Sequence, residues 1–216
     1  MRDAYHEELE AISTATVDLA NLVASAIGRA TTALLDGDLQ LAESVIAGDS
    51  VIDDRYHEIE ERVFDIFARQ QPVASDLRLL VATLRMVADI ERAGDMALHV
   101  AKVARRRYPL SAIPSELRST VLQMGQVAQK IMAKAGDVIA QRDVDLAGEI
   151  ETDDDQMDDL HKKVFSVLLG ERWQGGIESA IAVTLVGRYY ERFADHAVSV
   201  ARRVVYFVTG ERVVAD

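Results

Sequence analysis

The segment Glu91-Arg92-Ala93-Gly94-Asp95 has a second copy in this chain, because its charged residues return one hundred positions later in Glu191-Arg192-Phe193-Ala194-Asp195. Apolar residues around both segments recur at the three- and four-residue spacing of a helix. The agreement continues past the motif in the pairs Ala97 and Ala197, Val100 and Val200, and Ala101 and Ala201. A repeat of this length predicts two copies of one helical unit.

A second repeated segment lies ahead of the first in each half. Asp49 and Asp53 return 105 positions later as Asp154 and Asp158. The two shifts differ slightly, as a connecting loop of different length would produce. The same order of helical segments in both halves predicts three helices in each unit.

Prolines mark where the predicted helices are connected. Proline is costly inside a helix, and the chain has only Pro72, Pro109 and Pro114. No segment alternates apolar and polar residues as a strand does. The expected helices lie near residues 3–35, 38–70, 73–107, 115–141, 143–170 and 177–209. The predicted fold class is all-α, with six long helices in two tandem three-helix bundles, at residues 1–108 and 109–216.

Composition excludes several kinds of protein. A chain with 49% hydrophobic and 28% charged residues is typical of a globular protein. The absence of cysteine excludes disulfides and thiolate metal sites, and favours a reducing compartment. We expect a cytoplasmic chain, because its first residues do not form a signal peptide and charges interrupt each apolar stretch. The net charge of −12 argues against nucleic-acid binding.

Acidic residues occupy helical positions where a core-facing stripe requires apolar ones. The stripe of the second expected helix comprises Val45, Asp49, Ile52, Tyr56, Ile59, Val63 and Ile66. That of the third comprises Leu77, Val81, Leu84, Ala88, Glu91, Asp95 and Leu98. Each half thus carries two acidic pairs. The two residues of each pair are four positions apart, so they lie on one face of a helix. The four pairs are Asp49 and Asp53, Glu91 and Asp95, Asp154 and Asp158, and Glu191 and Asp195.

Two kinds of explanation for these pairs stay open. Like charges at this spacing repel and a buried, unpaired carboxylate is costly, so a cation should compensate. Salt bridges from Arg92, Lys102, Arg192 or Arg202 could provide it, or the helix faces could simply be hydrated. The functional interpretation is one carboxylate-rich metal site in each half. All-oxygen ligands suit Mg²⁺, Mn²⁺ or iron; a structural zinc site is disfavoured, although carboxylates also bind zinc.

These residues carry a resemblance to a known family. The stretch Gln71-Pro72-Val73-Ala74-Ser75-Asp76-Leu77-Arg78, followed by Glu91 to Asp95, resembles the third-helix pattern of the PhoU family. Tyr190 to Ala197 resembles its second copy. The likeness extends along nearly the whole chain and is greatest to actinobacterial PhoY-type members. Family members often have asparagine four residues after the motif aspartate, where this chain has His99 and Ser199.

The resemblance implies a fold, a role and partners. It implies two three-helix bundles whose acidic motifs hold metal ions in some members. It also implies a cytoplasmic negative regulator of the phosphate-starvation response. Such a regulator links the ATPase subunit of the high-affinity phosphate ABC transporter to a sensor histidine kinase. We therefore expect an adaptor that forms a homodimer, reaches the membrane only through its partners and binds no nucleic acid.

The sequence favours an adaptor over an enzyme. It contains no nucleophile–base motif, phosphate loop or dinucleotide fingerprint. The alternative is a ferritin-like di-metal oxidoreductase or metal-storage bundle, which requires glutamates and two glutamate-x-x-histidine elements in one four-helix bundle. A structural scaffold without metal is the third possibility.

Overall fold

The structure is a computed structural model, and it describes residues 2–211 of the 216-residue chain. Six helices and no strand are found in this part of the chain. They are α1 (Arg2–Asp36), α2 (Leu39–Gln70), α3 (Ala74–Arg107), α4 (Ser115–Gln141), α5 (Val144–Leu168) and α6 (Gly176–Thr209). The predicted all-α fold with six long helices is confirmed. The division into units 1–108 and 109–216 stays a prediction.

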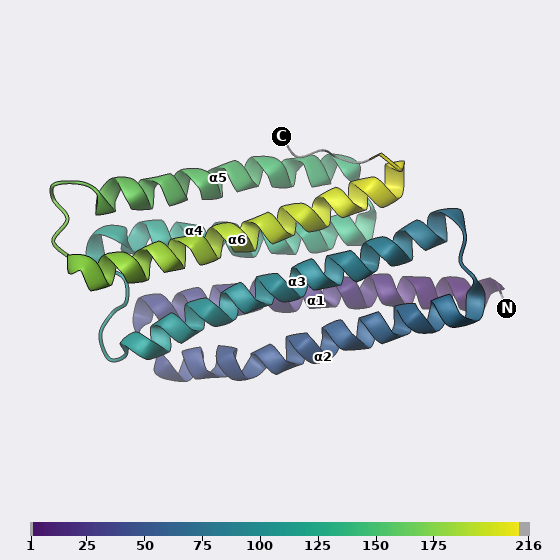
Figure 1. Cartoon of the computed structure of the whole chain (residues 1–216), viewed down its shortest axis with the longest axis horizontal. Helices are drawn as coiled ribbons and strands as arrows, with labels where there is room; N and C mark the ends of the chain where they lie inside the picture. Colours follow the sequence, from purple (N-terminus) through teal and green to yellow (C-terminus); the bar gives the residue numbers. More distant parts are fainter. Residues whose placement is uncertain (1, 212–216) are drawn as a thin grey trace.

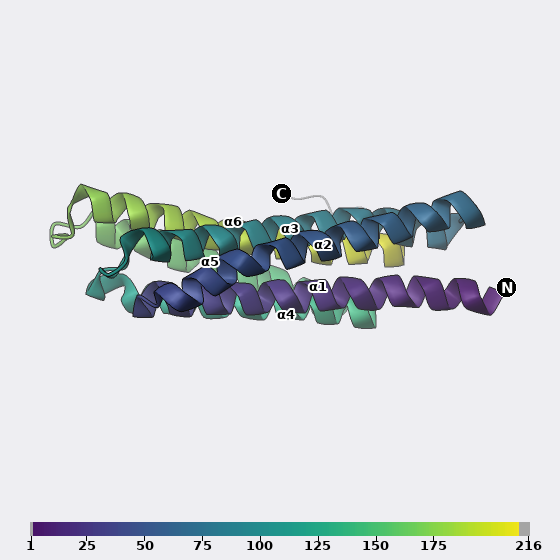
Figure 2. The same cartoon turned by 90° about the horizontal axis from the view of Figure 1, so that it is seen from below.

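The helices α1, α3, α4 and α6 form the centre of the elongated molecule, and α2 and α5 cover its edges (Figure 1). Each half packs its own three helices together, and α1·α4 and α3·α6 contacts join the halves. Seen from the side, α1 and α4 lie in one layer and α3 and α6 in the other (Figure 2). Consequently α2 lies at one outer edge, against α1 and α3, and α5 lies at the opposite edge, against α4 and α6.

The edge helices begin in the same way in the two halves. The carboxylate of Asp38 accepts a hydrogen bond from the backbone N–H of Leu41 (2.9 Å), which caps α2. Asp143 caps α5 by accepting from the backbone N–H groups of Asp145 (2.9 Å) and Leu146 (3.0 Å). An N-cap of this kind satisfies a free backbone donor and stabilises the helix by about 1 kcal/mol. The internal repeat therefore also includes the helix starts.

Small residues let α2 approach α3 closely beside the acidic motif. A Cβ atom at Gly94 would lie 3.2 Å from Ile52 of α2, and Ala93 and Ala97 are completely buried. The corresponding position in the second half is Ala194, also buried, and there the α5 residue corresponding to Ile52 is Met157. The motif thus lies where an edge helix touches a central helix.

The buried face of α3 differs from the predicted one. The stripe expected from Leu77 to Leu98 is mostly half-buried, and Leu77 is 42% exposed. The fully buried residues are Leu80, Val87, Ile90, Ala93, Ala97, Val100 and Ala101. This difference arises because α3 contacts α1 and α6 as well as α2, which turns its core face toward the centre of the molecule. Glu91 and Asp95 therefore lie at the margin of the core.

Candidate functional site

The first acidic cluster forms where α2 lies against α3. Asp49 and Asp53 come from α2, Glu91 and Asp95 come from α3, and all four are half-buried. Burial raises the pKa of Asp49, and repulsion from Asp53 and Asp95 raises it further. Burial likewise raises the pKa of Glu91, with added repulsion from Asp95 and Asp53. The structure therefore brings the four predicted residues into one electrostatic group.

The second acidic cluster forms where α5 lies against α6. Asp154 and Glu191 are half-buried, whereas Asp158 and Asp195 are exposed. Burial raises the pKa of Asp154 to about 6, assisted by repulsion from Asp195 and Asp158. Burial and the neighbouring Asp195 also raise the pKa of Glu191. These four residues also form one electrostatic group. Among them, the charged form is least favourable for Asp154.

Direct salt bridges do little to compensate either cluster. Among residues 2–211, Glu191 is the only one of the eight acidic residues that forms an ion pair, with Arg188 one turn earlier. Arg202, considered above as a compensating cation, instead donates from Nε to Glu151 at 2.9 Å. Lys102 and His99 lower the pKa of Asp49, but without an ion pair. Compensation from within the chain is therefore partial.

The clusters do not form a closed metal site. In the described part of the chain, no three His, Asp or Glu side chains come close enough together to hold one metal ion. The donor set, made only of carboxylates in each cluster, suits a hard cation chemically. The positions of the side chains do not fit one as they stand, so binding would require them to reorient.

Two other acidic residues, Asp89 and Asp153, are more deeply buried than any member of the clusters, and neither was predicted from the sequence. Asp89 on α3 accepts from Arg203 Nε at 2.7 Å, and its other oxygen lies 3.4 Å from His196 Nδ1. Burial opposes ionisation of Asp89, but hydrogen bonds from His196 and Arg203 outweigh it and lower its pKa. These contacts tie α3 to α6 and so join the two halves.

Asp153 has the matching role inside the second half. Lys130 and Lys134 of α4 both reach it at 2.6 Å, which holds α5 against α4. The repeat hid Asp89 and Asp153, because the corresponding positions in the other half are Tyr189 and Gly48. The position of Asp89 between Ala88 and Ile90 was a signal for finding it, whereas Asp153 stands in the acidic run 153–155, which gave no such signal.

Comparison with known proteins places both halves in one family. The PhoU domain matches residues 16–104 and again residues 121–204. A Mycobacterium tuberculosis protein named "Phosphate-specific transport system accessory protein PhoU homolog 2" is 47% identical over 210 residues, covering 97% of this chain and 99% of that protein. A Rhizobium meliloti PhoU homolog is 30% identical over 96% of this chain and 88% of its own length.

Two solved structures that resemble this chain come from the same family as these relatives. The crystal structure of PhoU from Pseudomonas aeruginosa has a TM-score of 0.87 and 30% identity, covering 96% of this chain and all of that one. PhoU from Streptococcus pneumoniae gives 0.86 with 25% identity, covering 98% of this chain and all of that one. The sequence motifs, the domain matches and the shared architecture lead to one conclusion: this chain belongs to the PhoU family.

Proposed function

We propose that this chain is a non-enzymatic accessory regulator of phosphate-specific transport. The observation that carries the proposal is the match of both halves to the PhoU domain, together with relatives named as accessory proteins of phosphate-specific transport. In the finer form of the proposal, the chain is a negative regulator of the phosphate-starvation response. It acts as an adaptor between the ATPase subunit of the phosphate ABC transporter and a sensor histidine kinase.

An exposed apolar end of the molecule supports a docking role. Leu110, in the loop after α3, is 73% exposed. Leu169 and Ile177, in and after the loop that follows α5, are 84% and 82% exposed, and both loops lie at the same end of the bundle (Figure 1). Apolar side chains that are exposed together in one patch are typical of a protein contact surface. We propose that this end serves partner binding or a homodimer contact.

We place the protein in the cytoplasm, next to the membrane only through its partners. By length and composition, one described helix could span a membrane, the part of α1 from Tyr5 to Asp36. Its apolar side is already occupied, because Leu19, Val23 and Ile27 are buried in the bundle core. This packing supports a core helix rather than a membrane span.

We also propose that the acidic clusters take up cations. Mutual repulsion and an all-oxygen donor set support uptake of Mg²⁺, Mn²⁺, iron or zinc after the side chains reorient. The ferritin-like alternative has less support. Its metals lie inside a four-helix bundle, whereas these clusters lie at the seams between an edge helix and the central helices.

Deleting the gene tests the regulatory proposal. We expect phosphate-starvation genes to be expressed in phosphate-rich medium, and a pull-down from phosphate-replete cells to recover the transporter ATPase and the kinase. In cells without a second copy, unchanged phosphate-responsive transcription after deletion would refute the proposal. Light scattering of the purified chain tests the homodimer separately.

A further inference from the structure

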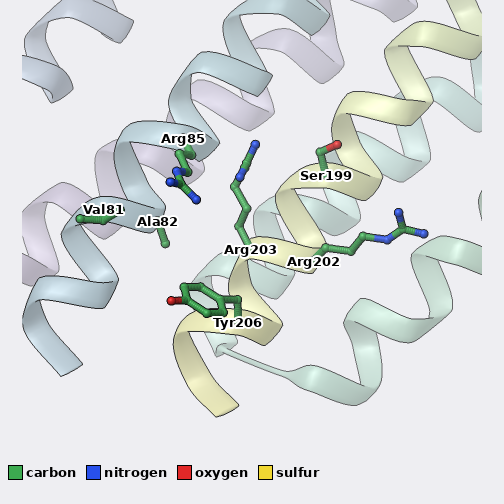
Figure 3. Close-up of a pocket in the computed structure, with 7 residues that line it drawn as sticks. All are labelled: Val81, Ala82, Arg85, Ser199, Arg202, Arg203 and Tyr206. Carbon is green, nitrogen blue, oxygen red and sulfur yellow. The ribbon is translucent and has the colours of Figure 1, made fainter. Parts of the chain in front are cut away.

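A basic cavity lies between α3 and α6, where the two halves of the chain meet (Figure 3). Its volume is about 470 Å³, within the range of small-molecule sites. It is lined by Val81, Ala82 and Arg85 of α3 and by Ser199, Arg202, Arg203 and Tyr206 of α6. The lining has no acidic residue, although the chain carries a net charge of −12.

Two of the three arginines are available to a ligand. Arg202 is turned away toward α5, where its Nε binds Glu151 at 2.9 Å. Arg85 and Arg203 lie on facing sides of the gap between the helices (Figure 3). Within residues 2–211, Arg85 forms no ion pair, and the single acidic partner of Arg203 is Asp89. Two guanidinium groups facing one space repel, and an anion between them would relieve that repulsion.

The contact with Asp89 fixes Arg203 without occupying its terminal amino groups. Asp89 binds the Nε atom at 2.7 Å, and Asp89 itself is 9% exposed and lies beside His196. A guanidinium held through Nε keeps its terminal amino groups free, and these donate well to phosphate oxygens. The orientation of Arg203 is therefore set before any ligand arrives, which lowers the entropic cost of binding.

The charged residues at this cavity have no charged counterparts at the matching place in the repeat. In the repeat, Arg85 corresponds to Leu185, Arg203 to Val103 and Asp89 to Tyr189. The α3–α6 contact can thus be built without these charges, since the matching positions are apolar or aromatic. The arginines at this place need an explanation other than packing.

We propose that this cavity binds a phosphate-bearing anion, with Arg85 and Arg203 holding the phosphate oxygens. The hydroxyl of Tyr206 is a further donor in the lining, and Val81, Ala82 and the Tyr206 ring offer an apolar wall for an organic group. The volume accommodates a phosphate ester as well as free phosphate. This inference goes beyond the proposed regulatory function, because binding to the isolated chain requires no partner.

Isothermal titration of the purified chain tests the proposal with two probes, inorganic phosphate and adenosine monophosphate, each against chloride at equal ionic strength. We expect at least one probe to bind, and the tighter one identifies the source of the phosphate group. Arg85→Leu, which installs the residue found at position 185, should weaken binding about tenfold or more. Arg106→Leu is the matched control, since Arg106 is also an exposed α3 arginine without an ion pair within residues 2–211.

Three results would overturn the proposal: no binding of either probe, unchanged binding in Arg85→Leu, or an equal loss in Arg106→Leu. Arg203→Lys provides a second variant that keeps the charge near Asp89 and loses the planar fork. It should weaken binding with little change in melting temperature, and undiminished binding would contradict the assigned role. Failure of these tests would leave the regulatory proposal standing, because deletion of the gene measures that role independently.

Discussion

The two acidic clusters occupy the same place in the repeat, yet Asp154 of the second cluster is less well compensated than Asp49 of the first. Asp49 has Lys102 and His99 near it, and both lower its pKa. The strongest influences on Asp154 are burial and other carboxylates, and its pKa rises to about 6. The same backbone arrangement therefore gives two different electrostatic environments.

Three changes between the halves explain the difference. Ile46 corresponds to Glu151, which binds Arg202 and so diverts the counterpart of Lys102 away from the cluster. His99 corresponds to Ser199, which carries no charge. Ser50 corresponds to Asp155, which adds to the repulsion at Asp154. The comparison shows that residues around the motif, and not the motif alone, set the charge state of each cluster.

The largest expected effect comes from breaking the contact between Arg203 and Asp89, which joins the two halves and has no counterpart in the repeat. Arg203→Leu leaves the buried Asp89 with His196 alone, and we expect a loss of about 2 kcal/mol in the free energy of unfolding. The neighbouring Arg202→Leu breaks only an exposed pair and should cost less than about 1 kcal/mol. Denaturant unfolding of both variants measures the difference, and equal losses would refute a special role for Asp89.

Neutralising the less compensated aspartate should stabilise the protein. Asp154→Asn removes a carboxylate whose pKa is about 6 in the folded chain and 3.8 without perturbation. The folded state therefore binds the proton of this carboxyl group more tightly than the unfolded state does. The energetic penalty is fully present above pH 6 and disappears as the pH falls toward about 4. We expect a gain of about 1 kcal/mol at pH 7 in the presence of chelator, after allowing for screening by water, and no gain near pH 4.

The matched variant Asp49→Asn should give a smaller gain, because Lys102 and His99 already offset part of the repulsion. Unfolding measured at both pH values checks the pair of variants. A larger gain for Asp49→Asn than for Asp154→Asn would contradict the comparison.

If the clusters bind metal, then in the presence of the cation the Asp→Asn variants should be less stable than the wild type instead of more stable. A ligand that binds only the folded state raises stability, so Mg²⁺ or Mn²⁺ should raise the melting temperature of the wild-type chain by a few degrees. The same additions should have less effect on Asp154→Asn. If neither cation changes the melting temperature of the wild type, and iron and zinc fail as well, the metal proposal is wrong.

The smallest expected effect comes from giving the second half a feature of the first. Glu151→Ile removes the partner of Arg202 and frees this side chain to face Asp154. We expect the pKa of Asp154 to fall from about 6 toward its ordinary value, with a change in stability of a few tenths of a kcal/mol. Carboxyl NMR titration of the variant measures the shift. An unchanged pKa would mean that Glu151 does not control this cluster.

The sequence predicted what local and repeated patterns determine. Prolines and the helical spacing of apolar residues located all six helices, and the two shifts paired Asp49 with Asp154 and Glu91 with Glu191. The core face of α3 was not predictable in this way. That face depends on packing against α1 and α6, and a single-helix stripe contains no information about neighbours on several sides.

Features without a repeat, or with partners far along the chain, escaped prediction. The partner of Asp89 lies 114 residues away in Arg203, so only the antiparallel packing of α3 on α6 brings them together. The same packing creates the cavity at Arg85. The acidic pairs are recognisable in the sequence because they occur twice, whereas the most deeply buried acidic residues, Asp89 and Asp153, each occur once.

One measurement tests the central comparison most directly: carboxyl NMR titration of the wild-type chain, freed of metal by chelator. We expect Asp154 to titrate near pH 6, and Asp49 to titrate above its ordinary value but below Asp154. Equal pKa values for the two residues, or an ordinary value for Asp154, would contradict the claim that neighbouring residues make the repeated clusters different.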